Sequence, residues 1–216
     1  MRLYEKWRPQ TFADMVGNPK AVNTLAALCK QGIGGRALWL SGPSGAGKTT
    51  AARIASASIA DPKWATVEVD AGAVSPDDVR QWSMDCHKYG WGIGGRAWII
   101  NEAHGLRAAT IRALLVWLEE LPDHCVVVFT TTAAGEDKLF DDQMDASPLL
   151  SRCITVSFTN QGLAQAFAER ARTIAVAEGL DGQPPERYLR LARDRKSNMR
   201  AMLQDIEAGA LTGGAA

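Results

Sequence analysis

The chain has 216 residues, enough for one substantial hydrophobic core and a smaller second one. Its 24 basic and 24 acidic residues cancel, so attraction to nucleic acid would need a local basic patch or several subunits. No apolar run approaches the length of a membrane helix, and the opening MRLYEKWRPQ is charged where a secretory signal is apolar; we therefore expect a cytoplasmic protein without membrane contacts.

Five short apolar or β-branched runs predict β-strands, and helical patterns at Lys48–Ala60 and Ala108–Leu121 lie between them. Strands that alternate with helices predict an α/β fold with a five-stranded parallel sheet covered by helices on both faces. Sheets of this kind bind ligands at the carboxyl ends of their strands. The predicted strands are Ala37–Leu40, Thr66–Val69, Ala97–Ile100, Cys125–Phe129 and Ile154–Ser157.

The pattern changes after Ser157. Three amphipathic helices follow, marked by Leu163 to Ile174, by Tyr188 to Ala192, and by Met199 to Ile206. We therefore expect a nucleotide-binding domain over residues 1–158 and a small all-helical lid domain over 159–211, with a flexible tail at 212–216.

The glycine-rich segment after the first strand matches the phosphate-binding pattern G-x-x-x-x-G-K-[ST] in full. Its backbone N–H groups and the following helix N-terminus would bind the phosphates of ATP, while the lysine reaches the β- and γ-phosphates and the threonine hydroxyl binds Mg²⁺. A glycine-rich turn with an incidental lysine is the structural alternative. The residues of this loop are Gly42, Pro43, Ser44, Gly45, Ala46, Gly47, Lys48 and Thr49, with Thr50 next.

The third predicted strand runs into the polar segment Asn101-Glu102-Ala103-His104. Glu102 is the candidate for the group that activates water. Asn101 occupies the position that faces the hydrated Mg²⁺, where a carboxylate is usual. Because an amide carries no charge to offset Mg²⁺, we expect hydrolysis to be weakened more than binding. His104 is more typical of a structural contact than of a catalytic base.

These segments together resemble the AAA+ clamp-loader ATPases, the bacterial gamma/tau subunit and the small subunits of replication factor C. The resemblance runs from Leu3 to about Leu211 and is most specific at the motifs given next. They are Tyr4 to Asn18 (YEKWRPQTFADMVGN), the phosphate loop, Val67–Ala71 followed by Asp78–Arg80, Asn101–His104, Leu114–Glu120 (LLVWLEE) and Ser151–Cys153 (SRC).

The resemblance implies roles for further residues. Thr132 would be a polar sensor near the γ-phosphate, Arg152 an arginine finger acting on the adjacent subunit, and Arg200 a lid sensor. Without the resemblance, Arg152 and Arg200 read as solvent-exposed arginines. The adenine and ribose pocket would be lined by Trp7, Arg8, Pro9, Val16 and Gly17.

The sequence also departs from that family. Family loaders carry a helical collar domain, which we expect this chain to lack, and bacterial gamma/tau subunits carry a cysteine-bound zinc module. The four cysteines Cys29, Cys86, Cys125 and Cys153 are far apart, so we expect free thiols and no zinc. An acidic loop at 134–147 is either a solvated connection or an element that binds a partner or repels DNA.

Basic and aromatic residues before and after the third strand are candidates for DNA contacts, although an aromatic surface turn explains them equally well. They are Lys88, Tyr89, Trp91, Arg96 and Arg107.

The sequence thus favours an ATPase that assembles with other AAA+ subunits and loads a sliding clamp onto primer-template DNA. Two alternatives remain open: a nucleotide-binding subunit that does not hydrolyse ATP, and another DNA-remodelling AAA+ motor.

Overall fold

The computed structural model describes residues 1–88, 94–132 and 146–212, which form two compact units. The sheet unit comprises Ala21–Gly42 and Lys48–Ser157. The helical unit comprises Met1–Lys20, Pro43–Gly47 and Phe158–Ala216.

The sheet unit contains a five-stranded parallel sheet of order β2-β3-β4-β1-β5. All five predicted strands are confirmed; β1, β3 and β4 are two residues longer than predicted, and β2 and β5 are one residue longer. The strands are β1 (Arg36–Ser41), β2 (Thr66–Asp70), β3 (Arg96–Asn101), β4 (Cys125–Thr131) and β5 (Cys153–Ser157).

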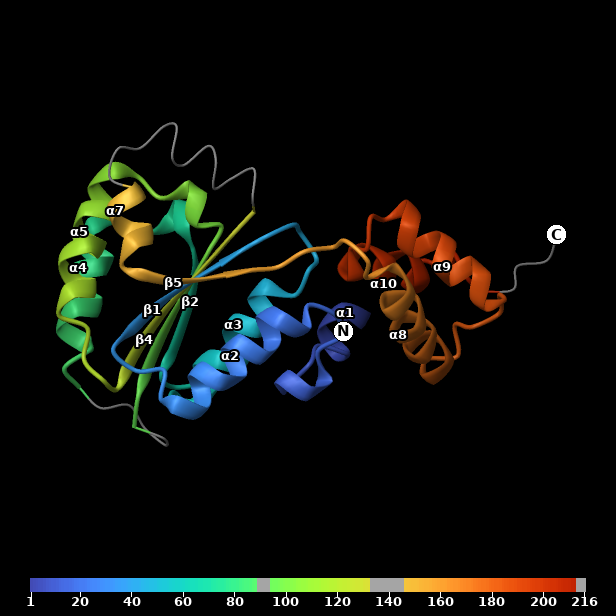
Figure 1. The fold of residues 1–216 in the computed structure, drawn as a ribbon, viewed down its shortest axis with the longest axis horizontal. Helices are drawn as coiled ribbons and strands as arrows, with labels where there is room; N and C mark the ends of the chain where they lie inside the picture. The colour runs from blue at the N-terminus through green and yellow to red at the C-terminus, as the bar shows by residue number, and fades with distance from the viewer. Residues whose placement is uncertain (89–93, 133–145, 213–216) are drawn as a thin grey trace. The chain divides into compact units, whose positions relative to one another are not determined.

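Helices cover both faces of this sheet, as the alternation of strands and helices predicted (Figure 1). On one face lie α2 (Pro19–Gln31) and α3 (Lys48–Ala57). On the other lie α4 (Pro76–Asp85), α5 (Ala108–Glu119) and α7 (Ala146–Ser151). Short 3₁₀ turns occur at η1 (Phe12–Asp14), η2 (Ala71–Ala73) and η3 (Ala103–Gly105).

The larger core fills the space between the sheet and helices α4 and α5. Trp98 meets Trp117 of α5 edge-on with ring centroids 4.9 Å apart, and Ile100 is fully buried in the same cluster. Because side chains of a strand alternate between the two faces, Asn101 at the end of β3 lies on the opposite face, which α3 covers. This alternation positions the polar end of β3 beside the start of α3.

The helical unit contains α1 (Leu3–Lys6), α8 (Ala164–Ala177), α9 (Pro185–Asp194) and α10 (Met199–Glu207). Leu3 belongs to the same buried cluster as Phe167 and Met202, so the first residues of the chain join the core of the C-terminal helices. The predicted division into a nucleotide-binding domain over 1–158 and a helical lid domain over 159–211 stays a prediction. Within the described residues, no helix is both long and apolar enough to cross a bilayer.

Candidate nucleotide-binding site

The phosphate loop connects β1 to α3, in the context that its motif requires. The Nζ of Lys48 donates a hydrogen bond to the carbonyl oxygen of Gly42 over 2.7 Å, and the Lys48 residue is only 7% exposed. Thr49 and Thr50 follow in the first turn of α3, where the helix N-terminus presents backbone amides and a partial positive charge. The local structure is therefore suited to bind an anion.

The middle of the loop, Pro43 to Gly47, belongs to the helical unit. The side-chain amide of Asn18 donates to the carbonyl oxygen of Ala46 over 3.4 Å. Gly45 and Gly47 have φ angles of +75° and +99°, a left-handed backbone conformation that residues other than glycine rarely adopt. The backbone conformation of the loop therefore requires glycine at these two positions.

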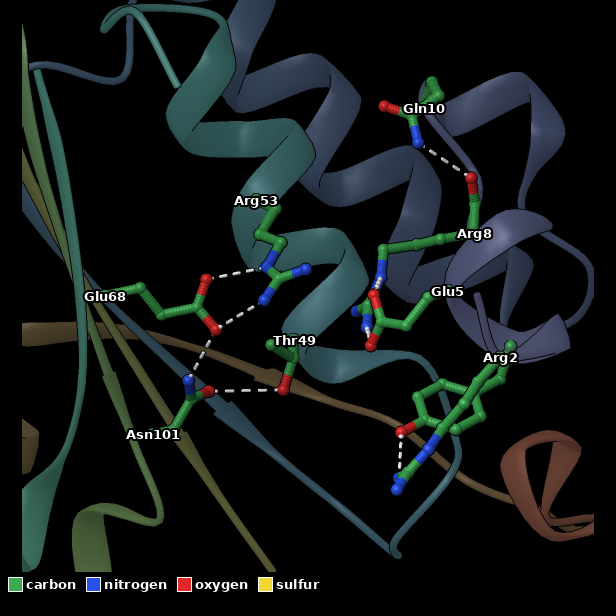
Figure 2. A network of polar contacts seen from close by, with 9 residues as sticks. Arg2, Glu5, Arg8, Gln10, Thr49, Arg53, Glu68 and Asn101 are labelled. Atoms are coloured by element: carbon green, nitrogen blue, oxygen red, sulfur yellow. Dashed lines mark hydrogen bonds and ion pairs between the residues drawn. The ribbon is translucent and has the colours of Figure 1, made fainter. Parts of the chain in front are cut away.

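Asn101 links the loop to the end of the sheet (Figure 2). Its Oδ1 accepts hydrogen bonds from the hydroxyls of Thr49, over 3.2 Å, and of Thr130, over 2.9 Å. Its Nδ2 donates to Glu68 over 2.9 Å, and Glu68 in turn pairs with Arg53. The structure therefore brings together Thr49 and Asn101, the two residues predicted to stand on the metal side.

Glu102, the candidate for water activation, follows directly at the end of β3. It has φ 53° and ψ 48°, a left-handed conformation that is uncommon outside glycine and that occurs at functional sites more often than elsewhere. Its Oε2 lies 3.6 Å from the Nδ1 of His104, whose ring also contacts the hydroxyl of Thr131 at 3.3 Å. The Glu102 side chain is 56% exposed, so it is open to a ligand in solution.

Strand β4 ends in Thr130 and Thr131, and Thr132 follows it. The sequence analysis assigned the sensor role to Thr132. Thr130 contacts Asn101 and Thr131 contacts His104, whereas Thr132 follows the strand and its carbonyl accepts from the Thr131 hydroxyl. Sequence reasoning did not identify Thr130 and Glu68, the two further residues that contact Asn101. The position of Thr130 at the carboxyl end of a buried strand, next to the strand that bears Asn101, is the signal that identifies it.

Arg152 lies between α7 and β5 and has partners within its own chain. Its guanidinium forms an ion pair with Glu119 at the end of α5 and donates to the carbonyl oxygen of Pro148 over 3.1 Å. The side chain is 35% exposed. Arg152 thus lies at the surface, where the Glu119 carboxylate pairs with its guanidinium.

The N-terminal residues predicted to line the adenine pocket lie in the helical unit. The indole Nε1 of Trp7 donates to Glu178 over 2.7 Å. Arg8 pairs with Glu5 over 2.6 Å, as Figure 2 shows. Their roles toward a nucleotide stay predictions. Pro9 is half-buried, Val16 packs against the helical core, and Gly17 has φ +83°.

Arg200, the predicted lid sensor, is exposed near the start of α10, and its guanidinium lies 5.6 Å from the centre of the Tyr4 ring. Asn198 caps this helix by accepting a hydrogen bond from the Ala201 amide over 3.1 Å. Arg200 therefore stands where the N-terminus of α10 adds its own partial positive charge.

The candidate DNA contacts are only partly described. Lys88 pairs with Asp85 over 2.9 Å, and Arg96 donates to the carbonyl of Lys88 over 2.7 Å, while Arg107 precedes α5. Tyr89 and Trp91 lie outside the described residues, as do the acidic residues of the 134–147 loop: Glu136, Asp137, Asp141, Asp142 and Asp145.

The four cysteines are free thiols, as predicted. Burial raises the pKa of Cys153 to about 12, and burial together with the neighbouring Cys86 raises the pKa of Cys125 to about 12. A raised pKa disfavours the thiolate, the form that attacks electrophiles or binds metal, so these two cysteines are suited to a structural role.

The sequence was compared with known proteins. No family model matches the chain. It is 30% identical over 204 residues to the DNA polymerase III subunit tau of Bacillus subtilis, an alignment that covers 82% of this chain and 34% of that protein. It is 29% identical over 174 residues to the tau subunit of Escherichia coli, covering 70% of this chain and 26% of that one. The chain thus spans about a third or less of the length of these relatives.

Solved structures agree on the fold. The Thermotoga maritima RuvB Holliday junction branch migration motor superimposes with a TM-score of 0.69 at 19% identity, over 93% of this chain and 64% of that one. A T. maritima RuvB variant gives a TM-score of 0.71 at 18% identity. By its similarity to the DNA polymerase III tau subunits, the chain belongs to the clamp-loader-like AAA+ proteins. The phosphate loop, the five-stranded sheet and the C-terminal helices of this AAA+ protein are those that the resemblance implied.

Proposed function

We propose that this AAA+ protein binds ATP with Mg²⁺, hydrolyses it, and acts as a clamp-loader-like subunit in DNA replication. The observation that carries the proposal is the connection of the phosphate loop to the end of β3 through the Thr49–Asn101 hydrogen bond. It joins the last residue of the predicted phosphate-binding loop to the strand end that carries the predicted hydrolytic residue, and both residues belong to the sheet unit.

The phosphate loop supplies the binding energy for the triphosphate. The loop amides, the α3 N-terminus and the Lys48 ammonium all present positive charge, and Lys48 exchanges its Gly42 carbonyl partner for phosphate oxygens when ATP binds. Loss of this lysine therefore removes the one full charge that the loop contributes.

The residues at the end of β3 fit a magnesium ion. The hydroxyls of Thr49 and Thr130 both lie within hydrogen-bonding distance of the Asn101 amide oxygen. Mg²⁺ prefers such oxygen ligands, several of them water. Thr49 would bind the ion directly and Asn101 through a bound water. When bound, the ion neutralises charge on the phosphate oxygens.

Glu102 would orient and deprotonate the attacking water. Its carboxylate follows the strand that carries Asn101, is accessible, and has His104 beside it to hold its orientation. Thr132 would help hold the same water, and Arg152 would stabilise the transition state in the site of a neighbouring subunit.

The resemblance to the tau subunits supports the wider role. Similarity to these DNA polymerase III subunits over most of the chain supports assembly with other AAA+ subunits, ATP-dependent engagement of a sliding clamp, and release on primer-template DNA.

Purified protein mixed with a sliding clamp from the same organism and primed DNA tests this role. We expect a complex, measured by light scattering, that forms with ATP or a slowly hydrolysed analogue and dissociates as ATP is consumed. Absence of any nucleotide-dependent association would contradict it, and ATP-driven strand displacement without a clamp would instead favour a DNA-remodelling motor.

Asn101 favours a second candidate, a subunit that binds ATP and fixes the geometry of an assembly without turnover. An amide cannot offset the ion's charge as a carboxylate does. Tight ATP binding without release of phosphate, in the presence of clamp and DNA, would support this second function over the first.

A further inference from the structure

The outward side and the end of α9 carry a concentration of positive charge that the chain as a whole lacks. Five of the ten residues from Arg187 to Lys196 are basic and one, Asp194, is acidic, although the whole chain has no net charge. All five basic residues are exposed. In a chain of zero net charge, such a local concentration is what attracts a polyanion. We call these residues the basic face: Arg187, Arg190, Arg193, Arg195 and Lys196.

The packing of α9 directs these side chains into solvent. The helix packs along α8 in the helical unit (Figure 1) and buries Tyr188 and Ala192. Arg187, Arg190 and Arg193 recur every third residue, so they lie along one outward side, about 4.5 Å apart along the helix axis. Phosphates of one DNA strand follow each other about 3.4 Å apart along the duplex axis, so long arginine side chains at this spacing can reach neighbouring phosphates.

Most of this charge is not neutralised within the chain. Arg195 pairs with both carboxylate oxygens of Asp205, over 2.5 and 2.8 Å, and Arg190 lies 3.8 Å from Asp194. In the part of the chain that the structure describes, the other three side chains form neither an ion pair nor a hydrogen bond. They are Arg187, Arg193 and Lys196.

The stability of α9 does not account for this arrangement. Arg187 lies in the first turn, where the partial positive charge of the helix N-terminus disfavours a cation. Arg193, in the last turn, is favoured by the helix dipole, but like charges three residues apart repel each other. The spacing of the arginines therefore points to an anion outside the chain.

The surroundings of the basic face favour nucleic acid over an acidic protein as that anion. Protein interfaces have a hydrophobic core, yet no large apolar side chain is exposed from residue 185 to residue 200. Interfaces with DNA are more polar and more positively charged, and arginine is suited to phosphate oxygens. We propose that the basic face binds the phosphate backbone of duplex DNA without sequence preference. The choice of duplex DNA rests on the proposed role in DNA replication.

This surface differs from the DNA contacts that the sequence indicated, which lie in the sheet unit. There Lys88 pairs with Asp85 over 2.9 Å, and Arg96 donates to the carbonyl oxygen of Lys88. Each of these cations already uses donors within the chain. The three unpaired cations of the basic face do not.

Fluorescence anisotropy of a short labelled duplex of mixed sequence, without nucleotide, tests the proposal. Wild-type affinity should fall steeply between about 50 and 200 mM salt, because each phosphate contact releases a counterion. In the triple variant Arg187→Gln, Arg193→Gln, Lys196→Gln, the slope of log affinity against log salt should be shallower by about 2 to 3, and binding at about 0.1 M salt at least about tenfold weaker. Arg187→Lys with Arg193→Lys keeps both charges and should keep the wild-type slope.

A matched triple variant controls for net charge. Lys30→Gln, Lys63→Gln and Arg172→Gln remove the same number of exposed cations away from the basic face and should leave the slope unchanged. Melting curves of every variant report folding. Labelled polyglutamate of similar charge tests the acidic-protein alternative and should bind more weakly than DNA.

Four results would each overturn the proposal. They are no binding of DNA by wild type at low salt, an equal loss in the matched triple variant, a loss in the double lysine variant as large as that in the glutamine variant, and tighter binding of polyglutamate than of DNA.

The proposed function fails in a different way. If Lys48→Ala binds an ATP analogue as wild type does, the function is rejected, while DNA binding through the basic face, measured without nucleotide, still stands. If Lys48→Ala loses nucleotide binding and the triple variant of the basic face binds DNA as wild type does, only this inference is rejected.

Discussion

The side-chain oxygen of Asn198, the capping residue of α10, occupies the space that a side chain at Gly45 would need. A Cβ built on Gly45 would lie 2.0 Å from the Asn198 Oδ1, far closer than atoms approach without displacement. The phosphate loop thus touches the residue that starts the helix bearing Arg200. A displacement of Gly45 would therefore alter its contact with this helix end.

Gly45→Ala should lower both stability and nucleotide affinity. A side chain at φ +75° costs roughly 1–2 kcal/mol by itself, and the clash with Asn198 displaces either the loop or the cap. Thermal melting and analogue binding measure the two effects. Gly72→Ala is the matched control, because a Cβ at Gly72 meets no atom within 4 Å. Equal behaviour of the two variants would contradict the tight approach of loop and cap.

Glu102→Gln should abolish phosphate release while leaving ATP affinity within about threefold of wild type, because an amide keeps the shape but cannot take a proton from water. Phosphate release at saturating ATP and analogue titration provide the two readouts. His104→Asn, which changes the neighbour of Glu102 over 3.6 Å, should slow turnover less. Full turnover by Glu102→Gln would place the general base elsewhere.

Arg152→Ala should leave stability nearly unchanged, because its ion pair with Glu119 is partly exposed and such pairs contribute about 0–1 kcal/mol. If Arg152 acts as an arginine finger, turnover in the assembled state should fall by about 10³-fold or more. Glu119→Ala removes the same ion pair but keeps the guanidinium, so it serves as the control. Equal turnover of the two variants would rule out the finger.

The contact between the N-terminal segment and α8 should make the helical unit sensitive to acid. Hydrogen bonds from Lys6 and then from Trp7 lower the pKa of Glu178 from its ordinary 4.5. A lowered folded-state pKa contributes stability above the unfolded-state pKa, and that contribution is lost as pH falls through the folded-state value. Stability from this group should therefore be constant near neutral pH and fall below about pH 4.5.

Glu178→Gln removes this titration. Its melting temperature should decline less than that of wild type between about pH 6 and about pH 3. Glu169→Gln, in helix α8, whose C-cap is Glu178, is the control and should retain the wild-type decline. A wild-type-like decline in Glu178→Gln would mean that other carboxylates dominate acid unfolding.

Local patterns were sufficient to predict the sheet and the loop. The run VVVF of β4 is fully buried, and Gly45 and Gly47 have the left-handed angles that their motif implies. Long-range pairs were not predictable in this way. Trp7 and Glu178 are 171 residues apart and nothing near either residue indicates the other.

Glu68 shows why part of the site was missed. In the strand TVEVD it occupies a polar position of an alternating pattern, which reads as a solvent-facing residue of an edge strand. Only the pairing of β2 with β3 brings Glu68 to Asn101, and the order of strands in a sheet cannot be predicted from a local sequence pattern. Thr130 was passed over in favour of Thr132 because the choice rested on spacing within a family motif and not on which hydroxyl reaches Asn101.

The central claim is that the loop from Gly42 to Thr49 binds a triphosphate through the Lys48 ammonium. Titration of wild type and of Lys48→Ala with a slowly hydrolysed ATP analogue tests it most directly, with melting curves to confirm that the variant folds. We predict saturable binding by wild type and a loss of at least about tenfold in the variant, since hydrogen bonds to charged groups contribute about 1.5–3 kcal/mol. Undiminished affinity in a folded Lys48→Ala protein would contradict the account.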